Sequence, residues 1–234
     1  MRTIIIGDVH GCFDELTALL NKVEFCILSD RLILLGDLLD RGPDSYRVLK
    51  KALELNSAMG DRFIYLMGNH EDMAVDAADS GDRSLWYCNG GAKTRKSFYK
   101  AGSRIEKYTG YLKKLRLYWE TDDWICVHAG ISLSGPENTE RDVFLWDRRI
   151  AGGEPYGGKL LVYGHTPMKE VLYQNEGGNS AVVLQGIRYS LPERGSICLD
   201  TGCVFGGKLS AMVIENGWYR VEAVLKGDME FLKG

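Results

Sequence analysis

Six short apolar runs recur along the chain, and each is followed at once, usually through a glycine, by aspartate, asparagine or histidine. The runs are residues 4–6, 32–35, 63–67, 124–127, 160–163 and 197–199. They are short and uncharged, which is typical of strands buried on both faces of a sheet. Because α/β proteins build their sites at the ends of such strands, the pattern predicts an α/β fold with its chemistry at one edge.

Between the strands, apolar residues recur at the spacing of a helix that buries one face. The stripe after the first strand is Phe13, Leu16, Leu19, Leu20 and Val23. The stripe after the second strand is Val48, Leu49, Ala52 and Leu53, behind Pro43, which a first helical turn tolerates. A polar helical segment is expected after the third strand, to about Ala78. Residues 209–214 and 218–224 flank Asn216-Gly217, which predicts a tight hairpin.

The pattern changes between Gly81 and Asp123. Asn89-Gly90-Gly91 marks a turn, and Ser103 with Glu106 is expected to form a capping box ahead of another helical stripe. We interpret this segment, at about 81–123, as a helical insertion between core strands of a single domain spanning 1–234. A glycine-rich loop is expected at 152–158.

Composition narrows the class of protein. The formal net charge is -3, so the chain lacks the excess of positive charge that is typical of nucleic-acid-binding proteins. No apolar run approaches the ~20 residues that a membrane helix needs. The six cysteines form no Cys-x-x-Cys pair, and the first strand begins at once with no signal peptide. A cytoplasmic protein with reduced, mainly structural cysteines is therefore expected.

The strand ends supply a set of metal-ligand side chains without thiolates. The set is Asp8, His10, Asp37, Asn69, His128 and His165. This mixture suits Mn²⁺, Fe or a catalytic Zn²⁺, and does not suit a structural zinc. Six donors are more than one catalytic ion can use, but they are enough for two ions ~3.5–4 Å apart if one carboxylate bridges them. Such a pair would acidify a bound water and bind the oxygens of a phosphoryl group. The alternative is that each histidine is an ordinary core residue and each aspartate a cap.

The stretch Gly36-Asp37-Leu38-Leu39-Asp40-Arg41-Gly42 is also open to two interpretations. Two carboxylates and a guanidinium at the end of a buried strand need partners that neutralise them. Alternatively, Asp40 and Arg41 form a surface ion pair, and Gly42-Pro43 only turns the chain.

An ordered set of motifs resembles the phosphoprotein phosphatase family, a branch of the calcineurin-like metallophosphoesterases. The motifs are Gly7-Asp8-x-His10-Gly11, Gly36-Asp37-x-x-Asp40-Arg41-Gly42, Gly68-Asn69-His70-Glu71, His128-Ala129-Gly130 and Gly164-His165, and Asp200-Thr201-Gly202-Cys203 resembles the bacterial members. The resemblance implies two mixed β-sheets packed as a sandwich, flanked by helices, with two divalent metal ions at the strand ends.

The resemblance also implies roles for individual residues. One ion would be held by Asp8, His10 and Asp37, and the other by Asp37, Asn69, His128 and His165. His70 would protonate the leaving oxygen while Asp40 orients it. Arg41 would bind the phosphoryl group, because a guanidinium matches two phosphate oxygens.

A second phosphate-binding arginine is expected between the last two histidines. Arg148 is the candidate, with Arg149 and Arg141 as alternatives. The other interpretation is that Arg148 is an ordinary solvated charge without a role in binding. Asn89 resembles a substrate-binding residue of bacterial members. Asp200 is expected to support a loop or ligand and not to bind metal.

The function implied is a manganese-dependent phosphomonoesterase acting on phosphoproteins, on phosphoserine, phosphothreonine or phosphotyrosine, with Fe or Zn as alternative metals. The main alternative is a symmetrical diadenosine tetraphosphate hydrolase, whose members commonly differ at Asp40 and carry aspartate in place of Glu71. A metal-dependent nuclease would lack Arg41, and a binding module without catalysis would not need the Asp40-His70 pair. The expected partner is a phosphoprotein or a small phosphoester, with no nucleic acid and no membrane. The sequence does not indicate the oligomeric state.

Overall fold

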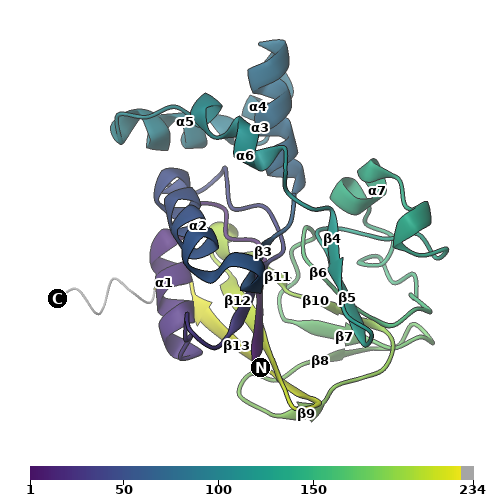
Figure 1. Cartoon of the computed structure of the whole chain (residues 1–234). Coiled ribbons are helices and arrows are strands. Elements are labelled where there is room, and N and C mark those ends of the chain that lie inside the picture. Colours follow the sequence, from purple (N-terminus) through teal and green to yellow (C-terminus); the bar gives the residue numbers. More distant parts are fainter. Residues whose placement is uncertain (228–234) are drawn as a thin grey trace.

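Figure 1 shows the computed structural model, which describes residues 1–227 as two mixed β-sheets flanked by helices. The first sheet has the order β3-β2-β1-β12-β13-β9, with β11 paired to β12, and the second has the order β4-β5-β6-β10-β7-β8. The strands of the first sheet are β1 (Thr3–Ile6), β2 (Arg31–Leu34), β3 (Phe63–Tyr65), β9 (Tyr189–Ser190), β11 (Asp200–Thr201), β12 (Lys208–Glu215) and β13 (Trp218–Leu225). Those of the second are β4 (Tyr118–Glu120), β5 (Trp124–Val127), β6 (Leu160–Tyr163), β7 (Leu172–Gln174), β8 (Ser180–Val182) and β10 (Ser196–Cys198). The predicted α/β sandwich is confirmed.

Helices cover the outer faces of the sandwich. The α-helices are α1 (Phe13–Lys22), α2 (Ser45–Met59), α3 (Asn69–Ser80), α4 (Ser84–Cys88), α5 (Gly91–Lys100), α6 (Thr109–Leu112) and α7 (Arg141–Trp146). The 3₁₀ helices are η1 (Gly60–Arg62), η2 (Ile105–Lys107), η3 (Pro136–Asn138) and η4 (Cys203–Phe205). No helix among the described residues is long and apolar enough to cross a membrane.

The apolar runs are explained by burial on both faces of each central strand. Side chains alternate along a strand, so Ile4 and Ile6 of β1 pack into the cluster that α1 and α2 join, while Ile5 packs between the sheets. In β6, Leu160 belongs to the core between the sheets, and Leu161 packs on the side of α7. No position of these strands faces water, and an alternating polar pattern is therefore absent.

Parallel pairing brings the ligand-bearing ends together. β1, β2 and β3 are mutually parallel, as are β5, β6 and β10. The carboxyl ends of parallel strands lie at one edge of a sheet, so the loops after them gather there.

Several local predictions are wrong. Ser103 forms no capping box, because its N–H donates to Phe98 O at 2.9 Å and so closes α5; η2 begins two residues later, behind Arg104. Pro43 lies outside the first turn, since α2 begins at Ser45 after Asp44.

The segment predicted as helical contains α4, α5, η2 and α6, but it also includes β4, which pairs antiparallel with β5. The assignment of the whole chain to one domain stays a prediction. The short strands β7, β8 and β9 and helix α7 were not predicted, because their few residues carry no sustained apolar period. All six cysteines are free; Cys26 and Cys88 are exposed, and the other four are buried.

Candidate active site

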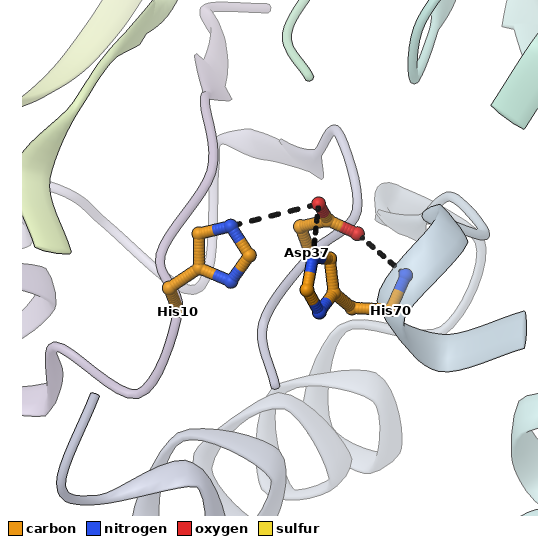
Figure 2. Close-up of side chains that lie close together, drawn as sticks. All are labelled: His10, Asp37 and His70. Carbon is orange, nitrogen blue, oxygen red and sulfur yellow. Dashed lines mark hydrogen bonds and ion pairs between the residues drawn. The ribbon is translucent and has the colours of Figure 1, made fainter. Parts of the chain in front are cut away.

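The loops after five strands converge on the Asp37 carboxylate. Figure 2 shows His10, from the loop after β1, and His70, at the start of α3, with a ring nitrogen of each turned toward it. One ligand atom from each of His10, Asp37 and His70 lies within 4.8 Å of the others, and the same holds for Asp37, His128 and His165. The structure thus brings predicted residues from distant motifs together, with Asp37 common to both groups.

The backbone of these loops is strained. Seven non-glycine residues of 1–227 have positive φ, and five of them are His10, Asp37, Asp40, Arg41 and His165, with φ between 45° and 70°. Such conformations cost about 1–3 kcal/mol each and persist only where the surroundings enforce them. A Cβ at Gly42 would collide with the carbonyl oxygen of His10, so this close loop packing requires glycine there. The strain is concentrated at the site and positions its side chains.

Glu71 fixes the loop that carries Asp37. Its carboxylate accepts the backbone N–H groups of Asp37 at 2.7 Å, Leu38 at 2.9 Å and Leu39 at 3.2 Å. It also accepts the N–H of Gly68 at 3.1 Å. Burial, followed by the charge of Asp37, raises the pKa of Glu71 to about 7. The sequence analysis placed this residue in a motif but did not predict this role.

Two histidines present unprotonated nitrogens to Asp37. The Nδ1 atoms of His10 and His128 lie 2.7 and 2.9 Å from the carbonyl oxygens of Leu39 and Leu35, to which Nδ1–H donates. In a neutral ring, Nε2 then carries a lone pair. These Nε2 atoms lie 3.6 and 3.5 Å from Asp37 Oδ2. Acceptors that face one another in this way fit a bound cation, and a backbone partner on the far nitrogen is the usual support of a metal-binding histidine.

The titration behaviour of the cluster agrees with this interpretation. Burial lowers the pKa of both His10 and His165 to about 3, so both rings are neutral, as metal ligands must be. Burial, with Asp200 and Asp37, raises the pKa of Asp8 well above its ordinary value. For Asp37, burial opposes ionisation, but the imidazoles, led by His128, lower its pKa overall.

His165 Nε2 is buried with no hydrogen-bond partner in the described structure. His165 Nδ1 and His128 Nε2 each lie 3.0 Å from Asn69 Oδ1. Crowded buried carboxylates and unpartnered nitrogens need cations, so the residues present fit divalent metal ions.

Asp40 and His70 form a fully buried pair. His70 Nδ1 lies 2.7 Å from Asp40 Oδ2, and both side chains have 0% exposure. Trp86 Nε1–H donates to Asp40 at 2.9 Å and Thr94 Oγ1–H donates at 2.6 Å. Burial works to lower the pKa of His70, but Asp37 and Asp40 raise it overall. His70 Nε2 has no hydrogen-bond partner among residues 1–227 and lies 3.8 Å from Asp37 Oδ2.

Trp86 and Thr94 were missed by the sequence analysis. They belong to α4 and α5, in the segment expected only to be helical. An indole and a hydroxyl in an amphipathic stretch give no signal of their target.

Arg41 lies beside His10, with its Nη1 2.6 Å from His10 Nε2 and its guanidinium 5.3 Å from the centre of the Phe205 ring. Trp146 borders the opposite group of residues, with its ring 6.1 Å from that of His165. Both aromatic side chains are exposed, at 63% for Phe205 and 37% for Trp146.

The other predicted substrate-binding residues are placed differently from one another. Arg149 pairs with Asp147 and Arg141 with Asp72. The charge of Arg148, after burial and His128, contributes to the lowered pKa of His165, and it opposes the rise in the pKa of Asp200 that burial causes. Arg148 is thus the nearest of the three to the site in electrostatic terms.

Asn89 is half-buried directly after α4, and its side-chain amide donates to Leu85 O at 2.9 Å. Asp200 accepts the N–H of Gly202 at 2.9 Å and so supports its loop. Burial raises its pKa to about 6. The roles of these residues in catalysis stay predictions.

Comparison with known proteins gives a consistent family. The model of the calcineurin-like phosphoesterase family matches residues 1–207. The chain is 30% identical to serine/threonine-protein phosphatase 1 of Salmonella typhimurium, covering 90% of this chain and 91% of that protein. It is 29% identical to the asymmetrical bis(5'-nucleosyl)-tetraphosphatase PrpE of Anoxybacillus flavithermus, covering 89% and 88%. A symmetrical bis(5'-nucleosyl)-tetraphosphatase of Vibrio parahaemolyticus is 35% identical, over 66% of this chain and 54% of that protein.

Solved structures show the same fold. A metallophosphoesterase from Sphaerobacter thermophilus superposes with a TM-score of 0.66 at 19% identity, covering 96% of this chain and 88% of that one. A cold-active protein-tyrosine phosphatase of a Shewanella species gives 0.65 at 18% identity, covering 96% and 80%.

Proposed function

The chain belongs to the calcineurin-like phosphoesterase family, and from that premise we propose that it is a two-metal phosphomonoesterase that acts on phosphoproteins. Phosphoester hydrolysis follows from the family; the phosphoprotein substrate is the proposal. The observation that carries it is the buried Asp40-His70 pair, whose geometry suits proton donation from His70 Nε2.

The need for an acid depends on the leaving group. The alkoxide of serine or threonine is strongly basic, so its departure benefits from a proton supplied in the transition state, an effect worth roughly 10²–10⁴-fold. A nucleotide leaves from a polyphosphate as a much weaker base and needs less help. An acid held this firmly favours phosphomonoesters of proteins.

The residues divide the remaining work between them. One ion would be held by Asp8, His10 and Asp37, and the other by Asp37, Asn69, His128 and His165. The bound ions would supply an acidified water and neutralise charge on the phosphoryl oxygens. Arg41 binds and orients the phosphoryl group through its guanidinium, and Arg148 is the proposed second cationic contact.

The nitrogen and oxygen donors suit Mn²⁺, and Fe or Zn²⁺ would also fit them. Members of this family bind divalent metals, and the His/Asp groups of this chain could hold them. Manganese is therefore part of the proposal.

Hydrolysis of dinucleoside tetraphosphates is the second candidate. Relatives of similar identity carry both kinds of name, so identity alone does not favour one substrate. The exposed rings of Trp146 and Phe205 at the border of the site would stack on a nucleobase.

The test compares kcat/KM for phosphoserine and phosphothreonine peptides with that for diadenosine tetraphosphate, at equal Mn²⁺. We expect the peptides to be preferred. A value for the dinucleotide more than tenfold above every peptide would establish the second candidate instead.

A further inference from the structure

A hollow of about 460 Å³ is lined by residues of β3 and β4 and of the segments beside them. β3 and β4 are edge strands of the two sheets, and both are labelled in Figure 1. The hollow shares no residue with the candidate active site. Its wall includes the cationic side chains of Arg31, Lys114 and Arg116 and the rings of Tyr111 and Trp119, with Asp61 as its one acidic residue. We call it the edge hollow.

The three cations of the edge hollow have no anionic partner. Neither Arg31, Lys114 nor Arg116 forms an ion pair with any residue in the range 1–227, and Asp61 forms none either. By contrast, Arg2, one residue from β1, forms two hydrogen bonds with Asp30 at 2.7 and 3.1 Å. The edge hollow therefore carries an uncompensated positive charge.

The guanidinium of Arg31 is held in place by packing against aromatic side chains. Arg31 begins β2, and its guanidinium lies 4.6 Å from the centre of the Trp119 ring. Trp119 in turn packs against Trp124, with 5.2 Å between ring centres. The Nε atom of Arg31 is buried and has no acceptor in the described part of the chain. Arg31 is half-buried, and the described residues supply no anion for its charge. Burying part of a cation without a counter-charge is costly, so an anion bound in the edge hollow would offset that cost.

We propose that the edge hollow binds a small molecule through its phosphoryl group, with Arg31, Lys114 and Arg116 neutralising the negative charge. Guanidinium groups match phosphoryl oxygens in pairs, and a fixed guanidinium loses little freedom on binding. The volume lies within the range of about 300–1,000 Å³ that is usual for small-molecule sites. The Tyr111 and Trp119 rings flank the space for an organic part. Inorganic phosphate and an organic phosphate share this chemistry.

The experiment is isothermal titration of the full-length, Mn²⁺-loaded protein with two probes. One is inorganic phosphate, and the other is α,β-methylene-ADP, whose bridging carbon resists hydrolysis. Because the candidate active site also binds phosphoryl groups, we expect about two binding events per chain. Substitution Arg31→Gln should weaken one of them tenfold or more and leave kcat for p-nitrophenyl phosphate unchanged.

The matched control is Arg188→Gln. Arg188 also stacks on a tryptophan, with its guanidinium 4.9 Å from the Trp218 ring, but it borders a hollow of only about 80 Å³. Both binding events should persist in that variant. Because Arg31→Gln removes a packed side chain and can fail to fold, the exposed Arg116→Gln provides a second test and should weaken the same event.

The two probes distinguish the sources of the ligand. Equal binding of both at the edge hollow would indicate that free phosphate suffices, and tighter binding of α,β-methylene-ADP would indicate an organic phosphate. Binding of both probes that is unchanged in folded Arg31→Gln and in Arg116→Gln would overturn the proposal.

Discussion

Substitution Asp40→Asn tests whether the buried pair supplies a proton to the leaving group. Asparagine keeps the shape of aspartate and removes its charge. In the structure, Asp40 Oδ2 lies 2.7 Å from His70 Nδ1, and the carboxylate also accepts from Thr94 at 2.6 Å and Trp86 at 2.9 Å. The variant therefore retains the packing but loses the negative charge that favours a protonated His70.

The size of the effect follows from the hydrogen bond that is lost. A charge-assisted hydrogen bond of a buried pair is worth about 1.5–3 kcal/mol, and each ~1.4 kcal/mol is a factor of ten, so kcat/KM should fall about 10- to 150-fold. This loss applies to substrates that need the acid. Asp37 and Asp40 together raise the pKa of His70 against burial, so the pKa falls in the variant. The decline of peptide turnover with rising pH should therefore begin at a lower pH than in the unsubstituted enzyme.

The assay measures kcat/KM for a phosphoserine peptide and for p-nitrophenyl phosphate, whose leaving group needs little protonation. We expect the full loss with the peptide and a much smaller one with the aryl ester. Asp76→Asn is the matched control, because Asp76 is an exposed residue of α3, and its substitution should change neither value. An equal loss with both substrates, at unchanged metal content, would refute the reasoning and leave Asp40 a structural role only.

Three further predictions follow from the site and its surroundings. Exhaustive chelation should abolish turnover and Mn²⁺ should restore it, with elemental analysis finding about two ions per chain; full activity without metal would contradict the two-metal proposal. Glu71→Gln places an amide against backbone N–H groups that donate to a carboxylate in the unsubstituted protein. The free energy of unfolding measured in urea should therefore fall by about 1–3 kcal/mol. An unchanged midpoint would show that the loop keeps its conformation without the carboxylate. Arg2→Gln should destabilise by about 1–2 kcal/mol at pH 7. Burial works to raise the pKa of Asp30, but Arg2 and the Cys26 N–H lower it overall, below its ordinary value of 3.8. The stabilisation is therefore present above about pH 4 and is lost as the pH falls through the folded pKa. A difference between the two proteins that did not shrink as the pH was lowered from about 4 would contradict the prediction.

Much of the fold was predictable because the central strands are buried on both faces. Runs such as residues 32–35 and 160–163 contain no charged residue, so they were recognisable as buried strands. The aspartates and histidines after them were recognisable as possible metal ligands. The edges of the sheets were not predictable. β4 was assigned to the helical segment, since three half-exposed or exposed residues carry no period. Its place depends on pairing with β5, which is a property of the sheet and not of the segment.

By itself, the sequence determined which side chains could form the site and the class of chemistry they suit. That information is local: an apolar run followed by aspartate or histidine predicts a strand end with a ligand, whatever the rest of the chain does. The tertiary structure alone decided how the ligands are held and what surrounds them. Trp86 and Thr94 reach Asp40 across 46 and 54 residues of chain, and the edge hollow combines Arg31 with Trp119. Such contacts arise only when the loops pack, and the same packing enforces the positive φ of Arg41, which arginine does not favour by itself.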